Sequence, residues 1–468
     1  MVKYNVILCN KGGEGVAERT IAAIATPLGE GGIGIVRISG EKSAEIADKV
    51  FFSLNGKKIS EIKGYTALFG EIKKDGVRLD EAVALRFIAP KSYTGEDVVE
   101  LSVHGGALMV KEVLRAVLDA GAYLAGTGEF TKRAFLNGKL DLIKAESVMS
   151  LISAQNQSEL KLARSVHAGG VTKQLSLIED ELVSAAATIA AYCDYPEEDI
   201  GEIDTETFKA ELGRVQKALL KMLCEYDAGR ILREGVETVI VGSPNVGKST
   251  LMNLLTGINR SIVTSVAGTT RDVIEDTVML GEIPLRLADT AGIRESDDEV
   301  EAQGIALARQ RLTSSQLVLA VFDCSKEETE EDRLLLKECE DKPLIVILNQ
   351  CDKGCKFSDD FAKGHEVIKM SAKNGEGSQQ LVSAVARVTK TENLSPDSAV
   401  LISERQRELA NRAYMAVNEA LNAISLGVTP DAVGVLVDDA LTALYEMTGQ
   451  RVTESVTEEI FKKFCVGK

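Results

Sequence analysis

The sequence predicts a multidomain α/β protein in which an α/β domain is inserted into a helical domain, after an N-terminal α+β domain. The chain has 468 residues, which suits about three domains of about 150 residues each. Short β-rich runs change near Gly138 to apolar residues at helical spacing. Strands and helices alternate from Gly235 to about residue 390, and helical spacing resumes after the polar linker TENLSPDS.

The composition and charge of the chain argue against a membrane protein and against a broadly basic nucleic-acid-binding protein. Lys and Arg total 54 and Asp and Glu total 71, so the net charge is 54 − 71 = −17. Such a surface repels phosphate backbones, so any role with nucleic acid needs a local basic site or a partner. No apolar stretch reaches the ~18 residues of a membrane span. We therefore expect no membrane association, and a cytoplasmic protein whose eight cysteines are reduced.

The first domain, residues 1–137, alternates short β-rich runs with turns, and one amphipathic helix follows them. Period-2 patterning predicts strands and period-3.6 patterning predicts the helix. The expected elements are strands at Thr20–Thr26, Gly34–Ile38, Leu79–Phe87 and Val98–Val103 and a helix at Ala107–Ala120.

The helical domain is expected in two parts, residues 138–233 and 393–468, on either side of an α/β domain at residues 234–392. Insertion is tolerated where the ends of the inserted domain lie close together. Apolar spacing predicts helices at 140–167, 171–193, 205–232, 404–426, 431–447 and 457–464.

A phosphate-binding loop opens the inserted domain. The β-branched run Val236–Val241 leads directly into GSPNVGKST, which fits G-x-x-x-x-G-K-[ST]. In that pattern the backbone amides cradle the phosphates, Lys248 reaches the β- and γ-phosphates, and Ser249 binds Mg²⁺. The following helix, near Thr250, points its positive end at the anion.

Four further motifs follow in the order of a P-loop GTPase (Ras-like) domain. GTTRD supplies Thr270 as a second Mg²⁺ ligand, and DTAG supplies Asp289 and the Gly292 amide. In NQCD, Asp352 can accept two hydrogen bonds from guanine but not from adenine. SAK is the final loop near the base. The predicted GTP-binding residues are Asn245, Val246, Gly247, Lys248, Ser249, Thr250, Thr264, Ser265, Val266, Ala267, Gly268, Thr269, Thr270, Asp289, Thr290, Ala291, Gly292, Asn349, Asp352, Ser371, Ala372 and Lys373.

Two positions depart from the usual motifs. Gln350 replaces the lysine of N-K-x-D, whose stem normally covers the base, which bears on guanine affinity rather than on selectivity. Ile293 follows DTAG where many regulatory GTPases carry a water-orienting glutamine. Isoleucine cannot orient water, so another group must do so.

Taken together, the motifs resemble those of the MnmE (TrmE) tRNA-modification GTPase family. The resemblance runs from about Thr20 to Lys468, and its marks are TPLGEGGIGIVRISG, YTGEDVVELSVHGG, GEFTKRAFLNGKLDLIKAE, GSPNVGKST, GTTRD, DTAGIRE and the terminal FCVGK.

The resemblance implies a function that composition does not reveal. Family members help to add a carboxymethylaminomethyl or aminomethyl group to the wobble uridine of certain tRNAs. They work with MnmG (GidA), an FAD-dependent partner, in a heterotetramer. The one-carbon unit comes from a tetrahydrofolate derivative, 5-formyl or 5,10-methylene, held in an N-terminal folate-binding-like domain that also forms the homodimer.

The resemblance also assigns residues. Arg37, Glu100, Lys139 and Lys468 match folate-binding positions, and Cys465 matches the family's catalytic terminal cysteine. Glu301 matches its water-orienting glutamate. The implied K⁺ ligands are Asn245, Thr264, Val266 and Thr269.

Three alternatives remain at this stage. One is a ribosome-assembly GTPase switch, although such proteins usually carry a basic RNA-binding module that this acidic chain lacks. Another is a dimerising scaffold with degenerate nucleotide binding, which the intact Lys248 and Ser249 disfavour. A zinc site at Cys351, Cys355 and His365 would lack a fourth ligand.

Overall fold

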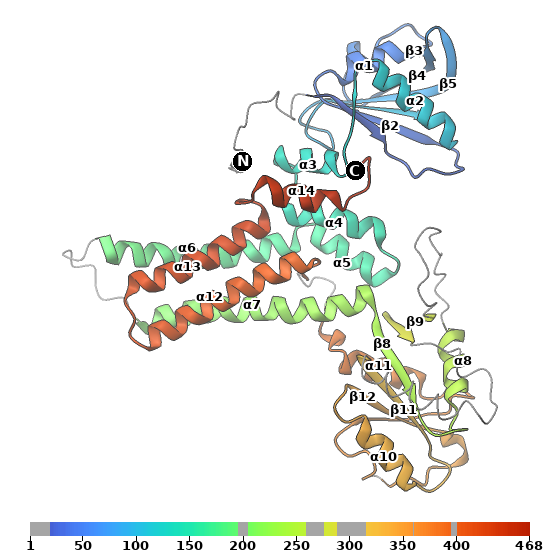
Figure 1. Ribbon diagram of the computed structural model, residues 1–468, viewed down its shortest axis with the longest axis vertical. Coiled ribbons are helices and arrows are strands. Elements are labelled where there is room, and N and C mark those ends of the chain that lie inside the picture. Colours follow the sequence, from blue (N-terminus) through green and yellow to red (C-terminus); the bar gives the residue numbers. More distant parts are fainter. Residues whose placement is uncertain (1–18, 195–204, 259–275, 288–314, 359, 395–399) are drawn as a thin grey trace. The chain divides into compact units, whose positions relative to one another are not determined.

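The computed structural model describes residues 19–194, 205–258, 276–287, 315–358, 360–394 and 400–468 (Figure 1). It forms two compact units. Unit 1 combines Met1–Ile152, Val166–Leu219 and Ser403–Lys468, and unit 2 combines Ser153–Ser165 with Leu220–Ile402. Most of unit 2 is therefore inserted between segments that fold together in unit 1.

Unit 1 contains a seven-stranded sheet in the order β3-β4-β5-β6-β2-β1-β7. Neighbouring strands are antiparallel except β1 and β7. Helices α1 (Ser43–Val50) and α2 (Ala107–Asp119) bury apolar side chains in one core with the sheet. The strands are β1 (Ile21–Ile24), β2 (Gly34–Ser39), β3 (Phe51–Ser53), β4 (Thr66–Lys74), β5 (Val77–Phe87), β6 (Val98–Val103) and β7 (Tyr123–Leu124).

Strand β4 is a difference from the sequence-based prediction, which places a single strand near residues 79–87. In the structure β4 and β5 form a long hairpin that turns at Asp75 and Gly76. Both turn residues have positive φ, 50° and 79°, as a tight Asp-Gly hairpin turn requires. The charged residues of β4 and β5 obscure their alternation in the sequence.

The helices of unit 1 come from both ends of the chain, and one ion pair joins them. Arg405 binds the Glu146 carboxylate through Nε at 2.9 Å and Nη2 at 3.1 Å. The same guanidinium donates to the main-chain carbonyls of Glu446 and Met447. The helices are α3 (Glu129–Leu136), α4 (Leu142–Ser153), α6 (Gly170–Asp194), α12 (Glu404–Ser425), α13 (Pro430–Thr448) and α14 (Glu454–Lys462).

The helix predicted at 140–167 is in fact two helices, α4 and α5 (Gln157–His167). The break lies at Asn156, whose Oδ1 accepts a hydrogen bond from the Glu159 amide at 2.8 Å. Glu159 in turn accepts from the Gln155 amide at 2.7 Å. These side-chain caps satisfy the orphan amides of a new helix start. Apolar spacing continues across the break and so hides it.

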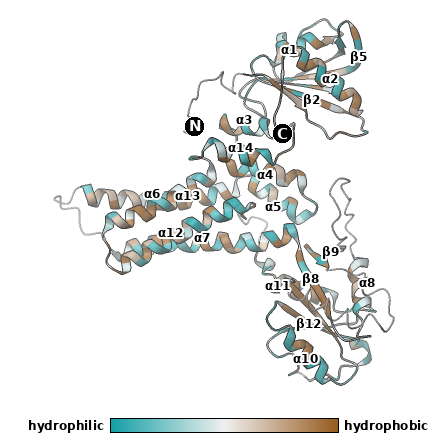
Figure 2. Ribbon diagram, viewed as in Figure 1, coloured by the Kyte–Doolittle hydropathy of each residue, from teal (hydrophilic) through white to brown (hydrophobic). Residues whose placement is uncertain are grey.

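Unit 2 contains a six-stranded sheet in the order β13-β12-β11-β8-β10-β9, parallel except for β9. One face packs on α8 (Lys248–Ile258) and α11 (Ser378–Val388), and the other packs on α10 (Glu330–Glu338). Its central strands are largely hydrophobic (Figure 2). The strands are β8 (Val236–Val241), β9 (Asp276–Leu280), β10 (Ile283–Leu287), β11 (Leu317–Asp323), β12 (Leu344–Asn349) and β13 (Glu366–Lys369).

The predicted fold class is confirmed: an α+β module, a discontinuous helical part, and an inserted α/β unit with a parallel sheet. Helix α7 (Thr205–Glu234) leads into β8. None of the helices in the described ranges is long and apolar enough to cross a membrane.

Candidate functional site

The phosphate loop of unit 2 has the backbone that its motif requires. Asn245 and Gly247 have positive φ, 62° and 99°. A Cβ on Gly247 would lie 2.2 Å from the Asn349 side-chain nitrogen, so only glycine fits there. Helix α8 begins immediately afterwards at Lys248, so its N-terminal amides face the loop. This arrangement is an anion-binding site of the kind that holds nucleotide phosphates.

Lys248 is folded back over the loop in the structure. Its Nζ donates to the carbonyls of Gly242 at 2.6 Å and Ser243 at 2.9 Å. Burial lowers the pKa of this ammonium group. The loop carbonyls therefore hold the lysine where a phosphate could bind it.

Asn349 joins two loops of the nucleotide site. It ends β12 and is buried. Its Nδ2 donates to the Val246 carbonyl at 2.9 Å, and its Oδ1 accepts from the Ala372 amide at 3.0 Å. The side chain thus links the phosphate loop to the SAK loop, a structural role that spacing in the sequence cannot reveal.

Asp352, which the sequence predicts to read the base, lies in a short turn, η4 (Cys351–Lys353), after β12. Gln350 precedes the turn with φ 64°. The Lys353 Nζ donates to the Gln350 Oε1 at 2.5 Å. A cation therefore stands beside the position where the usual motif has its lysine, and sequence reasoning did not find it.

Several predicted site residues lie outside the described residues, so the structure neither places nor excludes them. Among them are both predicted switch motifs, GTTRD and DTAG. These residues are Thr264, Ser265, Val266, Ala267, Gly268, Thr269, Thr270, Asp289, Thr290, Ala291, Gly292, Ile293 and Glu301.

A second group of predicted residues meets in unit 1. Strand register places Arg37 of β2 directly opposite Glu100 of β6. The Arg37 Nε donates to the Glu100 Oε1 at 2.8 Å, and both side chains are mostly buried. The Arg37 guanidinium also lies 5.3 Å from the ring centre of Tyr93 and 5.6 Å from that of Phe130.

The C-terminal segment folds onto the same place. Val466 pairs with Thr127 in an antiparallel bridge, and the Lys468 carbonyl accepts from the Phe130 amide at 3.2 Å. Arg37 donates to the Gly467 carbonyl at 3.3 Å. Gly467 has φ 100°, and a Cβ there would lie 2.1 Å from the Ile24 carbonyl oxygen. This close approach is available to glycine alone.

Of the remaining predicted residues, Lys468 and Cys465 belong to this segment, whereas Lys139 contacts the loop between β5 and β6. The Lys468 Nζ lies 5.9 Å from the Tyr93 ring centre, and burial, aided by Arg37, lowers the pKa of Lys468. Cys465 is exposed, and its carbonyl accepts from the Gly128 amide. The Lys139 Nζ donates to the Pro90 carbonyl, in the loop between β5 and β6, at 3.0 Å.

Sequence reasoning missed the aromatic residues and the polar network beside them. Tyr93 donates to or accepts from the Thr131 hydroxyl at 2.8 Å, and burial raises the pKa of its phenol. Nearby, Glu96 accepts from Ser39 at 2.7 Å and from the buried Arg133 at 3.1 Å. Tyr93 and Glu96 lie in the loop between β5 and β6, and their partners come from β2 and α3, so the sequence YTGED alone does not show these contacts.

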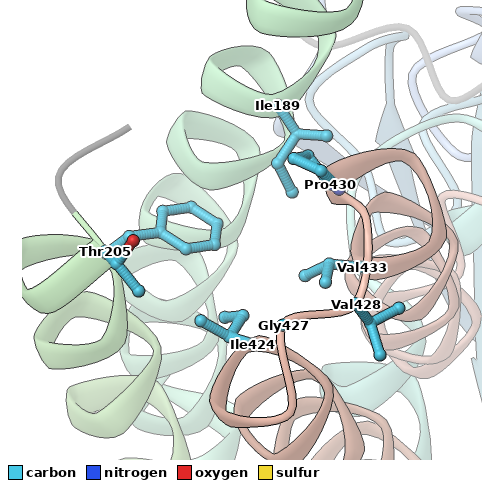
Figure 3. A pocket seen from close by; sticks show the side chains of 8 residues that line it. Ile189, Thr205, Ile424, Gly427, Val428, Pro430 and Val433 are labelled. Atoms are coloured by element: carbon cyan, nitrogen blue, oxygen red, sulfur yellow. The ribbon is translucent and has the colours of Figure 1, made fainter. Parts of the chain in front are cut away.

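Two other features do not provide a site. An apolar cavity of about 170 Å³ in the helical part is lined by side chains such as Ile189, Phe208 and Val433, and by Thr205 (Figure 3). It contains no titratable side chain. In the described ranges no three His, Cys, Asp or Glu side chains converge to hold a metal ion, so the zinc alternative gains no support.

Unit 2 therefore belongs to a known class. A parallel sheet whose first strand leads into a phosphate loop, with NQCD and SAK loops after its later strands, defines a P-loop GTPase domain. Comparison with known proteins identifies the family. Residues 142–465 match the family described as MnmE helical domain, and residues 20–139 match the GTP-binding protein TrmE N-terminus.

Curated relatives cover nearly the whole chain. The tRNA modification GTPase MnmE of Clostridioides difficile (strain 630) is 39% identical over 454 residues, covering 96% of this chain and 99% of that protein. The protein of the same name from Heliobacterium modesticaldum (strain ATCC 51547 / Ice1) is 40% identical over 462 residues, with the same coverage. The chain belongs to the MnmE family and is a GTP-hydrolysing enzyme.

Proposed function

We propose that this enzyme hydrolyses GTP in a K⁺-dependent manner and, with an FAD-dependent partner of the MnmG type, modifies C5 of the wobble uridine of certain tRNAs. The added group is carboxymethylaminomethyl or aminomethyl, and its one-carbon unit comes from a tetrahydrofolate derivative. Family membership supports the proposal. The observation that supports it is the contact between residues 465–468 and Arg37, which brings the C-terminal segment beside the Arg37–Glu100 ion pair.

In the nucleotide site, the chain's own residues bind and orient GTP. The amides of Val246 and Gly247 and the Lys248 ammonium face the phosphates, and Asp352 reads the guanine. Ser249 and Thr270 would hold Mg²⁺, which offsets phosphate charge. Asn245 with Thr264, Val266 and Thr269 would hold K⁺ for the same purpose. Glu301 would orient water in place of the missing glutamine.

The composition of the second site fits a folate. Arg37 and Lys468 supply positive charge that suits the carboxylates of a glutamate tail, and Glu100 suits the amine donors of a pterin. Tyr93 and Phe130 add aromatic surface. Lys139, beside the loop between β5 and β6, would bind the glutamate tail of the folate. When bound, the folate supplies a one-carbon unit, and Cys465 stands at the end of the same segment as Lys468.

The proposed assembly is a homodimer formed through the N-terminal domain, residues 1–137, that joins the MnmG partner in a heterotetramer and acts on tRNA in the cytoplasm. The helical domain would comprise residues 138–233 and 393–468, and the GTPase domain residues 234–392. Family membership favours this assignment over a ribosome-assembly switch and over a scaffold.

Cys465→Ser tests the proposal because the side chain is exposed and its loss disturbs no packing. Cells lacking the gene would be complemented with this variant, with the unaltered chain, or with Cys224→Ser, which changes another exposed cysteine on α7. We expect Cys465→Ser to retain GTP turnover and to lose wobble-uridine modification in tRNA nucleoside analysis, while Cys224→Ser retains both.

The proposal has two distinct ways to fail. Full wobble modification with Cys465→Ser would remove the thiol from the chemistry. Normal wobble nucleosides in cells that lack the gene, together with accumulated ribosome precursors, would instead support the ribosome-assembly alternative.

A further inference from the structure

Three cysteines gather around the base-reading turn of unit 2, and the proposed function uses none of their thiols. Cys324 follows β11 and is buried, Cys351 is the first residue of η4 and is half-buried, and Cys355 follows η4 and is exposed. The Cys324 thiol donates to the Asn349 carbonyl at 3.1 Å. The cluster therefore contacts the start of the motif that reads guanine.

Backbone geometry places Cys355 beside Cys324. The Cys324 Sγ lies 3.9 Å from the Gly354 carbonyl oxygen, and the Cys324 carbonyl accepts from the Lys356 amide at 2.8 Å. The residues on both sides of Cys355 therefore contact Cys324. Burial, together with the neighbouring Cys355 thiol, raises the pKa of Cys324 to about 12.

The third thiol does not turn the cluster into a metal site. No three potential ligands converge on one point in the described part of the chain. A pairwise reaction between two thiols is the chemistry that this arrangement permits.

We propose that Cys324 and Cys355 are an oxidation site, at which hydrogen peroxide converts the two thiols to a reversible disulfide that weakens guanine-nucleotide binding. This modification is separate from tRNA chemistry and acts on the nucleotide site alone.

The reaction balances in two steps. The exposed Cys355 thiol reacts with one hydrogen peroxide, giving a sulfenic acid and one water. The Cys324 sulfur then attacks the Cys355 sulfur, an S–S bond forms and an S–O bond breaks. The sulfenic hydroxyl leaves as a second water with the proton of the Cys324 thiol. Two thiols are oxidised and one peroxide is reduced. Cys324 is the slower partner because its raised pKa keeps it protonated.

The disulfide would alter the base-reading turn for two reasons. Its sulfur atoms must approach to about 2.05 Å, closer than two thiols in contact, so residues 354–356 must move toward β11. The Cys324 thiol also loses its hydrogen and with it the bond to the Asn349 carbonyl. Asp352 lies between these two points in the chain, so its carboxylate shifts from the position that fits guanine.

The test uses the full-length protein, first reduced and then treated with hydrogen peroxide. Non-reducing peptide mass spectrometry should find a Cys324–Cys355 linkage. Titration with a fluorescent GDP analogue should show about tenfold weaker binding, a change of about 1.4 kcal/mol. Dithiothreitol should reverse both effects.

Cys355→Ser should bind GDP normally before and after peroxide, because its site is exposed and only one sulfur of the pair remains. Cys224→Ser, an exposed control on α7, should respond like the unaltered chain. A Cys351–Cys355 linkage, Cys355 sulfinic acid without a linkage, or unchanged GDP affinity in the linked protein would each overturn the proposal.

Discussion

Asn349 of NQCD can act by contacting guanine or by holding the phosphate loop and the SAK loop together. Replacing Asn349 with alanine separates these two roles. In the structure both polar atoms of this buried side chain bind main-chain groups, the Val246 carbonyl and the Ala372 amide. Losing each hydrogen bond in a buried site costs about 1–2 kcal/mol. If both losses fall on the loop arrangement that binds nucleotide, the total of about 2–4 kcal/mol weakens binding about 30-fold to 1,000-fold.

The assay compares GDP with IDP, which lacks the exocyclic amine of guanine. Because Asn349 acts here through the two loops, Asn349→Ala should weaken both nucleotides by the same factor. Asp352→Ala should instead reduce the ratio of GDP to IDP affinity, since its carboxylate is the group proposed to bind that amine. Asn374→Ala, an exposed position in the SAK loop region, should change neither. A selective loss of GDP binding in Asn349→Ala would refute the loop-linking role.

Three further predictions concern the charge and packing of named side chains. Glu179 Oε1 is buried without a hydrogen-bond partner among the described residues, and burial raises the pKa of this carboxyl. Its charge therefore costs stability above that pKa, so Glu179→Gln should raise the thermal midpoint at about pH 8 but not below about pH 4. Glu146→Ala leaves Arg405 partly buried without its carboxylate, and should destabilise the helical part by about 3 kcal/mol in local hydrogen exchange. Gln350→Lys should tighten GDP binding about threefold in calorimetry, because a lysine stem can cover the base; weaker binding would count against that account.

Much of the fold is predictable because its signals are local. The strand Val236–Val241 has the predicted bounds, since a β-branched run followed by a glycine-rich loop leaves little freedom. The β4–β5 hairpin and the break at Asn156 are not predicted, because charged strand residues and continuous apolar spacing mask them. Local sequence patterns therefore predict whether a segment is a helix or a strand better than they predict where it begins and ends.

The sites divide in the same way. The phosphate loop is contiguous, so its motif suffices. The unit 1 cluster is not contiguous: Arg37 and Gly467 are 430 positions apart. Tyr93 comes from the loop between β5 and β6 and Phe130 from α3, and both meet Arg37 only in the folded chain. The resemblance to the MnmE family pointed to Arg37 near one end of the chain and to Cys465 and Lys468 at the other. The spacing of these residues in the sequence could not show that the two segments meet.

The pairing of residues 465–468 with Thr127, Phe130 and Arg37 has a consequence for the order of synthesis. A ribosome makes the sheet early, and the segment that completes its site leaves the exit tunnel only after the whole inserted GTPase unit has been translated. A nascent chain can therefore contain its whole GTPase unit before it contains residues 465–468. Only a chain that includes these residues can make the contacts with Thr127, Phe130 and Arg37.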